Sequence, residues 1–442
     1  MMTSRLAQNP KAARLLERIE NRSARAAVIG LGYVGLPLAI EIGHAGFPVV
    51  GLDADDDKVG RVLAKDSYIP DVASADVADL VDRKLLSATT DNAAVARAEL
   101  ISICVPTPLR KTKDPDLSYI LKATDAIARH LQPGSLIILE STTYPGTTEE
   151  AILPALEKTG LRVGEDFFLC FSPERVDPGN TEYPTRKIPK VIGGSTPLCT
   201  ELAVAYYSKV VDTVVPVHST RVAEMVKLLE NTFRMINIGL ANEMAVMCDR
   251  MGIDVWEVID AAATKPFGFM PFYPGPGLGG HCIPVDPHYL SWKAKQIGYS
   301  PRFIELASDI NRQMPEFVVE KTQSALNDRT RSVKGSKIHI VGVAYKRDVA
   351  DIRESPAIDI MALLERMGAQ VAYSDPYAPE ITVESTRYES QSLYESAASA
   401  DCVVIVTDHS QVDYRRLVDV SPLVVDSRNA TRGIDSEKIV RL

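Results

Sequence analysis

The chain has 442 residues, 45% of them hydrophobic and 24% charged, which predicts a globular protein of two to four domains. Its 49 Lys and Arg against 58 Asp and Glu give a net charge of −9, which excludes a broadly basic surface for nucleic acid. The apolar runs are far shorter than the roughly 18 residues of a membrane span, and the charged N-terminus lacks the apolar core of a secretory signal. We therefore expect a cytoplasmic protein with no nucleic-acid or membrane partner.

Six cysteines are spread along the chain without a CxxC pair. This spacing predicts reduced thiols and not a disulfide framework. A site made of His281, Cys282 and His288 matches no common metal-ligand spacing, so we expect no metal.

The first half of the chain alternates short apolar runs with helical stretches. The runs are residues 26–30, 48–53, 100–106, 136–141, 167–173 and 190–194. Continuous apolar strands separated by helices are typical of a parallel sheet covered on both faces. We expect a doubly wound domain over residues 1–218.

A G-x-G-x-x-G motif follows the first apolar run directly. Such glycines allow a tight turn and bring a dinucleotide diphosphate close to a helix N-terminus. The turn expected to bind the cofactor comprises Gly30, Gly32, Tyr33, Val34 and Gly35. Asp53 ends the next run, where a carboxylate takes ribose hydroxyls and repels the extra phosphate of NADP. We predict NAD as the cofactor; the alternative is a glycine-rich turn beside a surface aspartate.

Polar residues follow the next three runs. Ligands of open α/β sheets bind outside the carboxyl ends of the strands, so Thr107, Ser141 and Thr142 are candidate cofactor contacts. The alternative is that they are ordinary caps and turn residues. Glu174 and Arg175 lie in the charged loop FSPERVDPGN. A carboxylate there can position water or accept a proton, and an exposed loop charge is the alternative.

Residues 219–251 contain no proline and one glycine and are apolar nearly all round. A helix of this kind must be buried between domains or against a second subunit. Lys227 and Asn231 are four residues apart and share one helical face, from which they can stabilise an oxyanion. The alternative is a snorkelling lysine. We assign residues 219–332 to a central helical domain.

A glycine- and proline-rich loop over residues 274–287 exposes the thiol of Cys282 at a tight turn. A nucleophilic thiolate needs a lowered pKa or a nearby base, and His281, Lys227 and Asp286 are the candidates. For His281, packing or a loop hydrogen bond is the alternative. The loop distinguishes Cys282 from cysteines that lie inside apolar runs.

The alternation of strands and helices returns after residue 332. The apolar runs are residues 337–345, 370–376, 402–408 and 422–428. They predict a second doubly wound domain over residues 333–442. The expected fold class is therefore α/β, with two doubly wound Rossmann-like domains joined by a long central helix.

Five segments in this order resemble the UDP-glucose/GDP-mannose dehydrogenase family: GLGYVGLPLA, FSPERVDPGN, EMVKLLENTFR, GPGLGGHCIPVDP and GVAYKRDVADIRESPA. The resemblance covers nearly the whole chain. It implies an NAD-dependent nucleotide-sugar 6-dehydrogenase of polysaccharide biosynthesis. It also implies a C-terminal domain that binds the nucleotide diphosphate, and a homodimer or higher homo-oligomer formed through the central helix.

The resemblance also implies roles for particular residues. Cys282 resembles the family's nucleophile, and Lys227 and Asn231 its oxyanion-stabilising pair. Asp286 resembles the carboxylate that helps activate water or the thiol, and Glu174 the acidic residue of the catalytic loop. The residues expected to contact the nucleotide sugar are Arg175, Gly279, Lys346, Arg353 and Arg428.

One departure from the family pattern bears on the substrate. Val285 in GGHCIPVD stands where UDP-glucose enzymes of the family usually have lysine. In this respect the loop is similar to that of the branch that oxidises UDP-N-acetylhexosamines. The resemblance implies four-electron oxidation of UDP-N-acetylglucosamine through a thiohemiacetal and a thioester. The alternatives are a UDP-N-acetylmannosamine or UDP-glucose 6-dehydrogenase, a two-electron 3-hydroxyacid dehydrogenase, and a non-catalytic NAD-sensing or scaffold protein.

Overall fold

A computed structural model of the chain describes residues 6, 8–110, 114–176, 183–280 and 282–442. The backbone separates into two compact units, Met1–Glu230 and Asn231–Leu442, and each is described by itself. One long helix, α9 (Thr220–Met251), belongs to both. The candidate base His281 lies outside the described residues.

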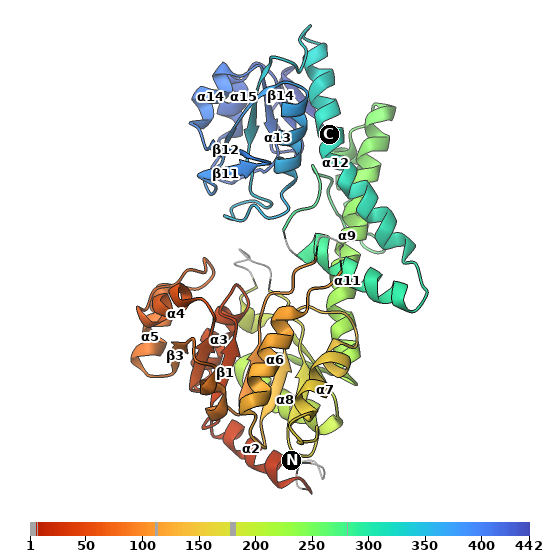
Figure 1. Cartoon of the computed structure of the whole chain (residues 1–442). Coiled ribbons are helices and arrows are strands. Elements are labelled where there is room, and N and C mark those ends of the chain that lie inside the picture. The colour runs from red at the N-terminus through yellow and green to blue at the C-terminus, as the bar shows by residue number, and fades with distance from the viewer. Residues whose placement is uncertain (1–5, 7, 111–113, 177–182, 281) are drawn as a thin grey trace. The chain divides into compact units, whose positions relative to one another are not determined.

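The first unit is built on an eight-stranded sheet of order β3-β2-β1-β4-β5-β6-β7-β8 (Figure 1). Its strands are β1 Ala26–Ile29, β2 Val49–Leu52, β3 Leu86–Thr89, β4 Leu100–Ile103, β5 Leu136–Leu139, β6 Phe168–Phe171, β7 Lys190–Gly194 and β8 Val214–Val217. The doubly wound sheet is confirmed, but parallel order is wrong at one place, because β7 runs antiparallel to β6. The edge strands β3 and β8 are missing from the prediction because each is only partly buried, so neither forms a continuous apolar run.

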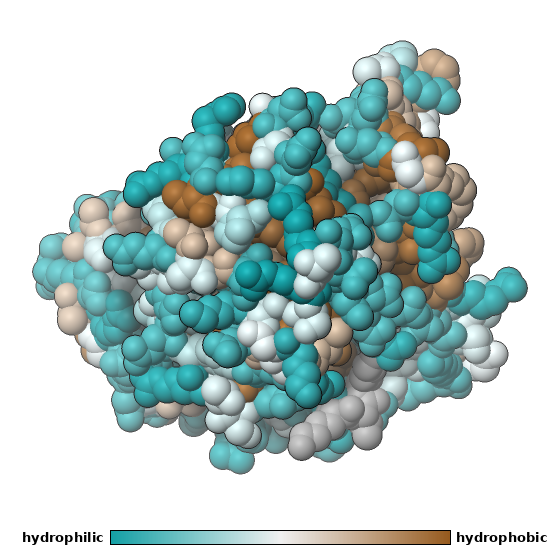
Figure 2. Space-filling view, turned by 90° about the horizontal axis from the view of Figure 1, so that it is seen from above, coloured by the Kyte–Doolittle hydropathy of each residue, from teal (hydrophilic) through white to brown (hydrophobic). Residues whose placement is uncertain are grey.

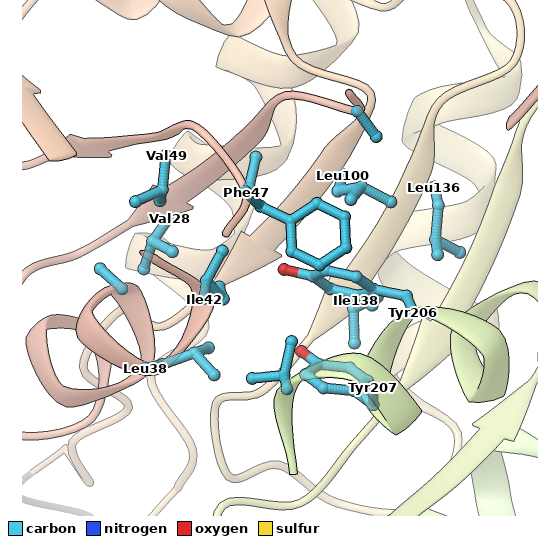
Figure 3. Packing of buried hydrophobic residues seen from close by; sticks show 14 of the residues in the cluster. Val28, Leu38, Ile42, Phe47, Val49, Leu100, Leu136, Ile138, Tyr206 and Tyr207 are labelled. Carbon is cyan, nitrogen blue, oxygen red and sulfur yellow. The ribbon is translucent and has the colours of Figure 1, made fainter. Parts of the chain in front are cut away.

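Helices cover both faces of this sheet. Successive residues of a strand point to opposite faces, so Val28 packs on the side of α3 and α8, whereas Ala27 and Ile29 pack on the side of α6. On the first side, Figure 3 shows Phe47 and Tyr206 against the strand residue Ile138. The helices are α2 Pro10–Glu20, α3 Gly35–His44, α4 Asp56–Leu63, α5 Ser74–Asp82, α6 Ser118–His130, α7 Leu153–Glu157 and α8 Pro197–Val210, with short helical turns η1 Asn92–Arg97, η2 Thr148–Ile152 and η3 Thr185–Lys187.

The second unit contains a five-stranded parallel sheet of order β10-β9-β13-β14-β15. Helices α12 and α13 pack on one face and α14 and α15 on the other. The strands are β9 Lys337–Val341, β10 Gln370–Ser374, β13 Cys402–Ile405, β14 Val424–Asp426 and β15 Ile439–Arg441, with a hairpin β11 Glu380–Val383 and β12 Thr386–Glu389. The helices are α10 Val255–Ala263, α11 Cys282–Gln296, α12 Arg302–Asn327, α13 Pro356–Arg366, α14 Leu393–Ser399 and α15 Tyr414–Val420. The second doubly wound domain is confirmed, although the prediction misses β15 and the hairpin.

The described part of the chain contains no helix with the length and apolar character needed to cross a membrane.

Helix α9 leaves one apolar face open to solvent. Figure 2 shows hydrophobic side chains reaching a mostly hydrophilic surface. Those on α9 are between 42% and 63% exposed and are Val222, Met225, Leu229, Phe233, Leu240, Met247 and Met251. Their spacing places them on one face of the helix, so this chain alone does not bury the helix as fully as its sequence predicts.

Candidate active site

The three glycines of the turn between β1 and α3 differ in the space around their Cα atoms. A Cβ on Gly30 would lie 2.6 Å from the carbonyl oxygen of Cys104, and one on Gly35 only 1.7 Å from the oxygen of Gly30. A Cβ on Gly32 would meet nothing within 4 Å. Gly30 and Gly35 therefore allow the turn to pack, whereas Gly32 keeps space open at the N-terminus of α3, which no side chain caps. This open, uncapped helix end fits the diphosphate of a dinucleotide.

Asp53 follows β2 and lies against the same turn. Its Oδ2 accepts a hydrogen bond from the backbone N–H of Leu31 at 2.7 Å, and the Lys58 ammonium lies 3.5 Å from that oxygen. The carboxylate is therefore fixed beside the glycines and is largely buried. This position suits a ribose-binding group at the end of the second strand.

The candidate contacts after β4 and β5 lie at the same edge of the sheet. Thr107 is buried and Thr142 half-buried. The Ser141 hydroxyl donates to the carbonyl oxygen of Val105 at 2.7 Å. Ser141 thus joins the loops that follow two neighbouring strands, and the loop it anchors presents Thr142.

The loop after β6 is held by its own charged side chains. Oε1 of Glu174 accepts the backbone N–H groups of Arg175 and Val176, each at 2.7 Å. The Arg175 guanidinium pairs with Glu230 of α9 at 2.7 Å and donates to the carbonyl oxygen of Pro189 at 2.6 Å. Arg175, an expected substrate contact, is therefore engaged within the first unit.

Two charged residues that the sequence reasoning overlooks lie beside Glu174. The Lys190 ammonium is 2.6 Å from Oε2 of Glu140 and 4.0 Å from Oε2 of Glu174. Burial raises the pKa of Glu140 even though Lys190 opposes it. Burial by itself would lower the pKa of Lys190, but Glu140 and Glu174 outweigh it and raise that pKa. The only sequence signal is a charge at the end of one apolar run and at the start of another, a common place for solvated residues.

The two polar residues of α9 are both buried. Within the described ranges, the Lys227 side chain makes no hydrogen bond or ion pair, which leaves its ammonium available to a ligand. The Asn231 amide donates to Oδ2 of Asp286 at 2.5 Å. The structure thus brings together two predicted residues that lie 55 positions apart.

Cys282 is the first residue of α11 and is exposed, whereas the other five cysteines are buried. Asp286 follows one turn later and is only 1% exposed. Free N–H groups in the first turn of a helix stabilise negative charge, including that of a thiolate. An accessible sulfur at this position can therefore act as a nucleophile.

The glycine loop before Cys282 packs against the segment that follows β9. A Cβ on Gly279 would lie 2.6 Å from Cβ of Tyr345. The backbone N–H of Gly280 donates to the carbonyl oxygen of Arg353 at 2.9 Å. This segment also carries Lys346, so the loop and two expected nucleotide-sugar contacts are neighbours.

The two arginines of the second unit that are expected to contact the nucleotide sugar, Arg353 and Arg428, are held by local partners. Arg353 pairs with Asp351 at 2.6 Å. Nε of Arg428 donates to the carbonyl oxygen of Val406 at 2.9 Å, and burial lowers the Arg428 pKa. A Cβ on Gly275 would lie 2.7 Å from the Arg428 guanidinium, so the glycine makes room for that group.

Three family models match successive parts of the chain. All belong to the UDP-glucose/GDP-mannose dehydrogenase family: its NAD binding domain matches residues 24–211, its central domain residues 221–313, and its UDP binding domain residues 339–433. Together these matches cover most of the chain.

Individual relatives agree with the family models. A UDP-N-acetyl-D-glucosamine 6-dehydrogenase of Pseudomonas aeruginosa is 40% identical over 83% of this chain and 86% of its own length. A UDP-N-acetyl-D-mannosamine dehydrogenase of Methanococcus maripaludis is 34% identical over 91% and 90%. The solved structure of a UDP-D-ManNAc dehydrogenase from Pyrococcus horikoshii has a TM-score of 0.86, 33% identity, and coverage of 94% of this chain and 98% of that one.

Proposed function

Because the chain belongs to the UDP-glucose/GDP-mannose dehydrogenase family, we propose that it oxidises the 6-hydroxyl of UDP-N-acetylglucosamine to a carboxylate. The chain is an NAD-dependent UDP-sugar dehydrogenase; its substrate and covalent mechanism are the proposal. The observation that carries the covalent mechanism is the exposed thiol of Cys282 at the start of α11, one turn before the buried Asp286.

The proposed chemistry removes four electrons from the primary alcohol. When bound, NAD⁺ accepts one hydride in each of two steps. The first step gives an aldehyde, to which the Cys282 sulfur adds as a thiohemiacetal. Loss of the second hydride leaves a thioester, and water then breaks the C–S bond to release the acid and the thiol. One alcohol, one water and two NAD⁺ thus yield one carboxylate, two NADH and three protons, and covalent capture retains the aldehyde.

The polar residues of α9 supply the electrostatic part of this proposal. Lys227 and the Asn231 amide stabilise the oxyanions that form at C6, since a desolvated donor is most effective where charge develops. Asp286 orients the Asn231 amide through their 2.5 Å hydrogen bond. Glu174 positions the water or accepts the proton.

The choice of sugar depends on the loop and on the relatives. Val285 takes the place of the lysine usual in UDP-glucose enzymes, and the relative at 40% identity acts on UDP-N-acetyl-D-glucosamine. The 2-epimer is the main rival, because other relatives are UDP-N-acetyl-D-mannosamine dehydrogenases. We propose that the nucleotide sugar is contacted by Arg175, Gly279, Lys346, Arg353 and Arg428.

We also propose a homodimer formed through α9 and a division into residues 1–218, 219–332 and 333–442. The exposed apolar face of α9 supports the dimer, because a second copy would remove it from water. The three successive family matches support the division. All six cysteines lie within the described residues and none forms a disulfide, which supports a reducing, cytoplasmic location.

The test is a panel of UDP-sugars with NADH counted by absorbance. Two NADH per UDP-N-acetylglucosamine are expected. One NADH would indicate a two-electron dehydrogenase. Catalytic efficiency at least about tenfold higher for the manno epimer or for UDP-glucose would overturn the substrate but leave the mechanism standing.

A further inference from the structure

Strand direction explains how Lys190 comes to lie at the carboxyl edge of the first sheet. In a parallel sheet the first residue of a strand lies at the opposite edge, far from the loops that bind ligands. Strand β7 instead runs antiparallel to β6, with Phe171 opposite Gly193. Counting three residues forward from Phe171 and three back from Gly193 places Glu174 level with Lys190.

Lys190 is bracketed there by two carboxylates from different strands. Glu140 follows β5 directly and precedes the loop that presents Thr142, and Glu174 follows β6. Both distances from the ammonium, 2.6 Å and 4.0 Å, are within ion-pair range. The Lys190 ammonium also lies 4.9 Å from the ring centre of Tyr207, whose hydroxyl donates to the other oxygen of Glu140.

Burying these charged side chains costs free energy unless each charge is held by a well-placed partner. The side chain of Glu140 is fully buried, and those of Lys190 and Glu174 are 8% and 13% exposed. A buried ion pair seldom contributes more stability than well-packed apolar side chains of the same volume, so stability alone is a weak reason for one. A second link joins the same parts, because Arg175 donates to Pro189, the residue before Lys190.

We propose that Lys190 is a positioning residue for the reaction: Glu140 and Tyr207 fix its ammonium, and the ammonium holds the Glu174 carboxylate in its working orientation. This inference rests on the proposed role of Glu174. Lys190 itself touches neither substrate nor cofactor in this scheme.

The test is a double-mutant cycle on the full-length enzyme with UDP-sugar and NAD⁺. Lys190→Met should lower kcat at least about tenfold while KM for NAD⁺ changes less than about threefold. In a Glu174→Gln background the same change should cost less than about threefold, because the group it orients is gone. Lys209→Met, which removes a partly exposed lysine paired with Glu20, is the control and should leave kcat unchanged.

Stability is separated from positioning by one further variant. Lys190→Met alone leaves the Glu140 carboxylate buried without a cation, which destabilises proteins strongly. Glu140→Gln/Lys190→Met removes both charges and should recover most of the lost melting temperature but not the lost turnover. The inference is overturned if Glu140→Gln/Lys190→Met recovers both the melting temperature and the turnover. It is also overturned if Lys190→Met lowers kcat equally with and without the Glu174 carboxylate. A wild-type chain that oxidises no UDP-sugar would overturn the proposed function and this inference with it.

Discussion

Gly32 and Gly35 lie three residues apart in one turn, yet alanine should affect them in opposite ways. At Gly35 the new Cβ would lie 1.7 Å from the backbone oxygen of Gly30, which has no rotamer with which to move away. Overpacking typically costs about 1–3 kcal/mol, and a backbone obstacle favours the upper end. At Gly32 the new Cβ meets nothing within 4 Å, so folding should be unaffected.

The expected change in melting temperature follows from the size of the first unit. A loss of roughly 3 kcal/mol of stability corresponds to about 2–4 °C per kcal/mol for a unit of this length. The melting temperature of the first unit should therefore fall by roughly 6–12 °C. For Gly32→Ala we expect an unchanged transition without ligand. Its affinity for NAD⁺ should fall at least about tenfold, or 1.4 kcal/mol, because the methyl group fills the space that the diphosphate needs.

The assay is thermal unfolding followed by circular dichroism, with and without NAD⁺, and calorimetric titration of NAD⁺ for Gly32→Ala. At an NAD⁺ concentration about 100 times the wild-type Kd, the ligand should stabilise the wild type by about 2.7 kcal/mol but Gly32→Ala by no more than about 1.4 kcal/mol. A Gly35→Ala variant that melts within about 2 °C of wild type, or a Gly32→Ala variant that binds NAD⁺ as tightly as wild type does, would refute these roles of the two glycines.

Four further outcomes are expected. Cys282→Ala should abolish acid formation and leave NAD⁺ binding intact by calorimetry; acid made at the wild-type rate would exclude covalent capture. Lys227→Ala should lower kcat about 100-fold to 1000-fold with little change in substrate KM, so a changed KM with normal kcat would assign the lysine to ground-state binding. Asp53 should make NADP⁺ a far poorer cofactor than NAD⁺, and equal efficiencies would contradict this. Burial raises the pKa of Glu224 from 4.5 to about 7, so the folded protein binds this proton more tightly and its stability falls as pH rises between those values. Relative to Glu224→Gln, the wild type should therefore lose about 3 kcal/mol of unfolding free energy between pH 4.5 and 7. A difference between the two proteins that does not change with pH would contradict the raised pKa of Glu224.

Local features of the sequence determined the elements that carry the cofactor site. Short continuous apolar runs that alternate with helical stretches are typical of buried parallel strands, so β1, β2, β4 and β5 follow from the local pattern. Glycine spacing identifies the turn at Gly30, because only glycine accepts its φ of +93° beside the oxygen of Cys104. Proline and glycine around residues 274–280 likewise indicated that Cys282 would be exposed while the other cysteines are buried.

Tertiary structure alone decided which of these residues meet. Asn231 and Asp286 lie on different helices and are joined by one hydrogen bond, which spacing along the chain does not encode. The direction of β7 is likewise absent from its local pattern, because KVIGG reads the same in a parallel or an antiparallel pair. Its pairing with β6 is selected by the course of the whole chain, and that choice brings Lys190 to the carboxyl edge of the sheet beside Glu174. The local pattern of residues determines which element each segment can form. Long-range packing determines which charged side chains become neighbours, because a buried charge needs a partner that can lie far away along the chain.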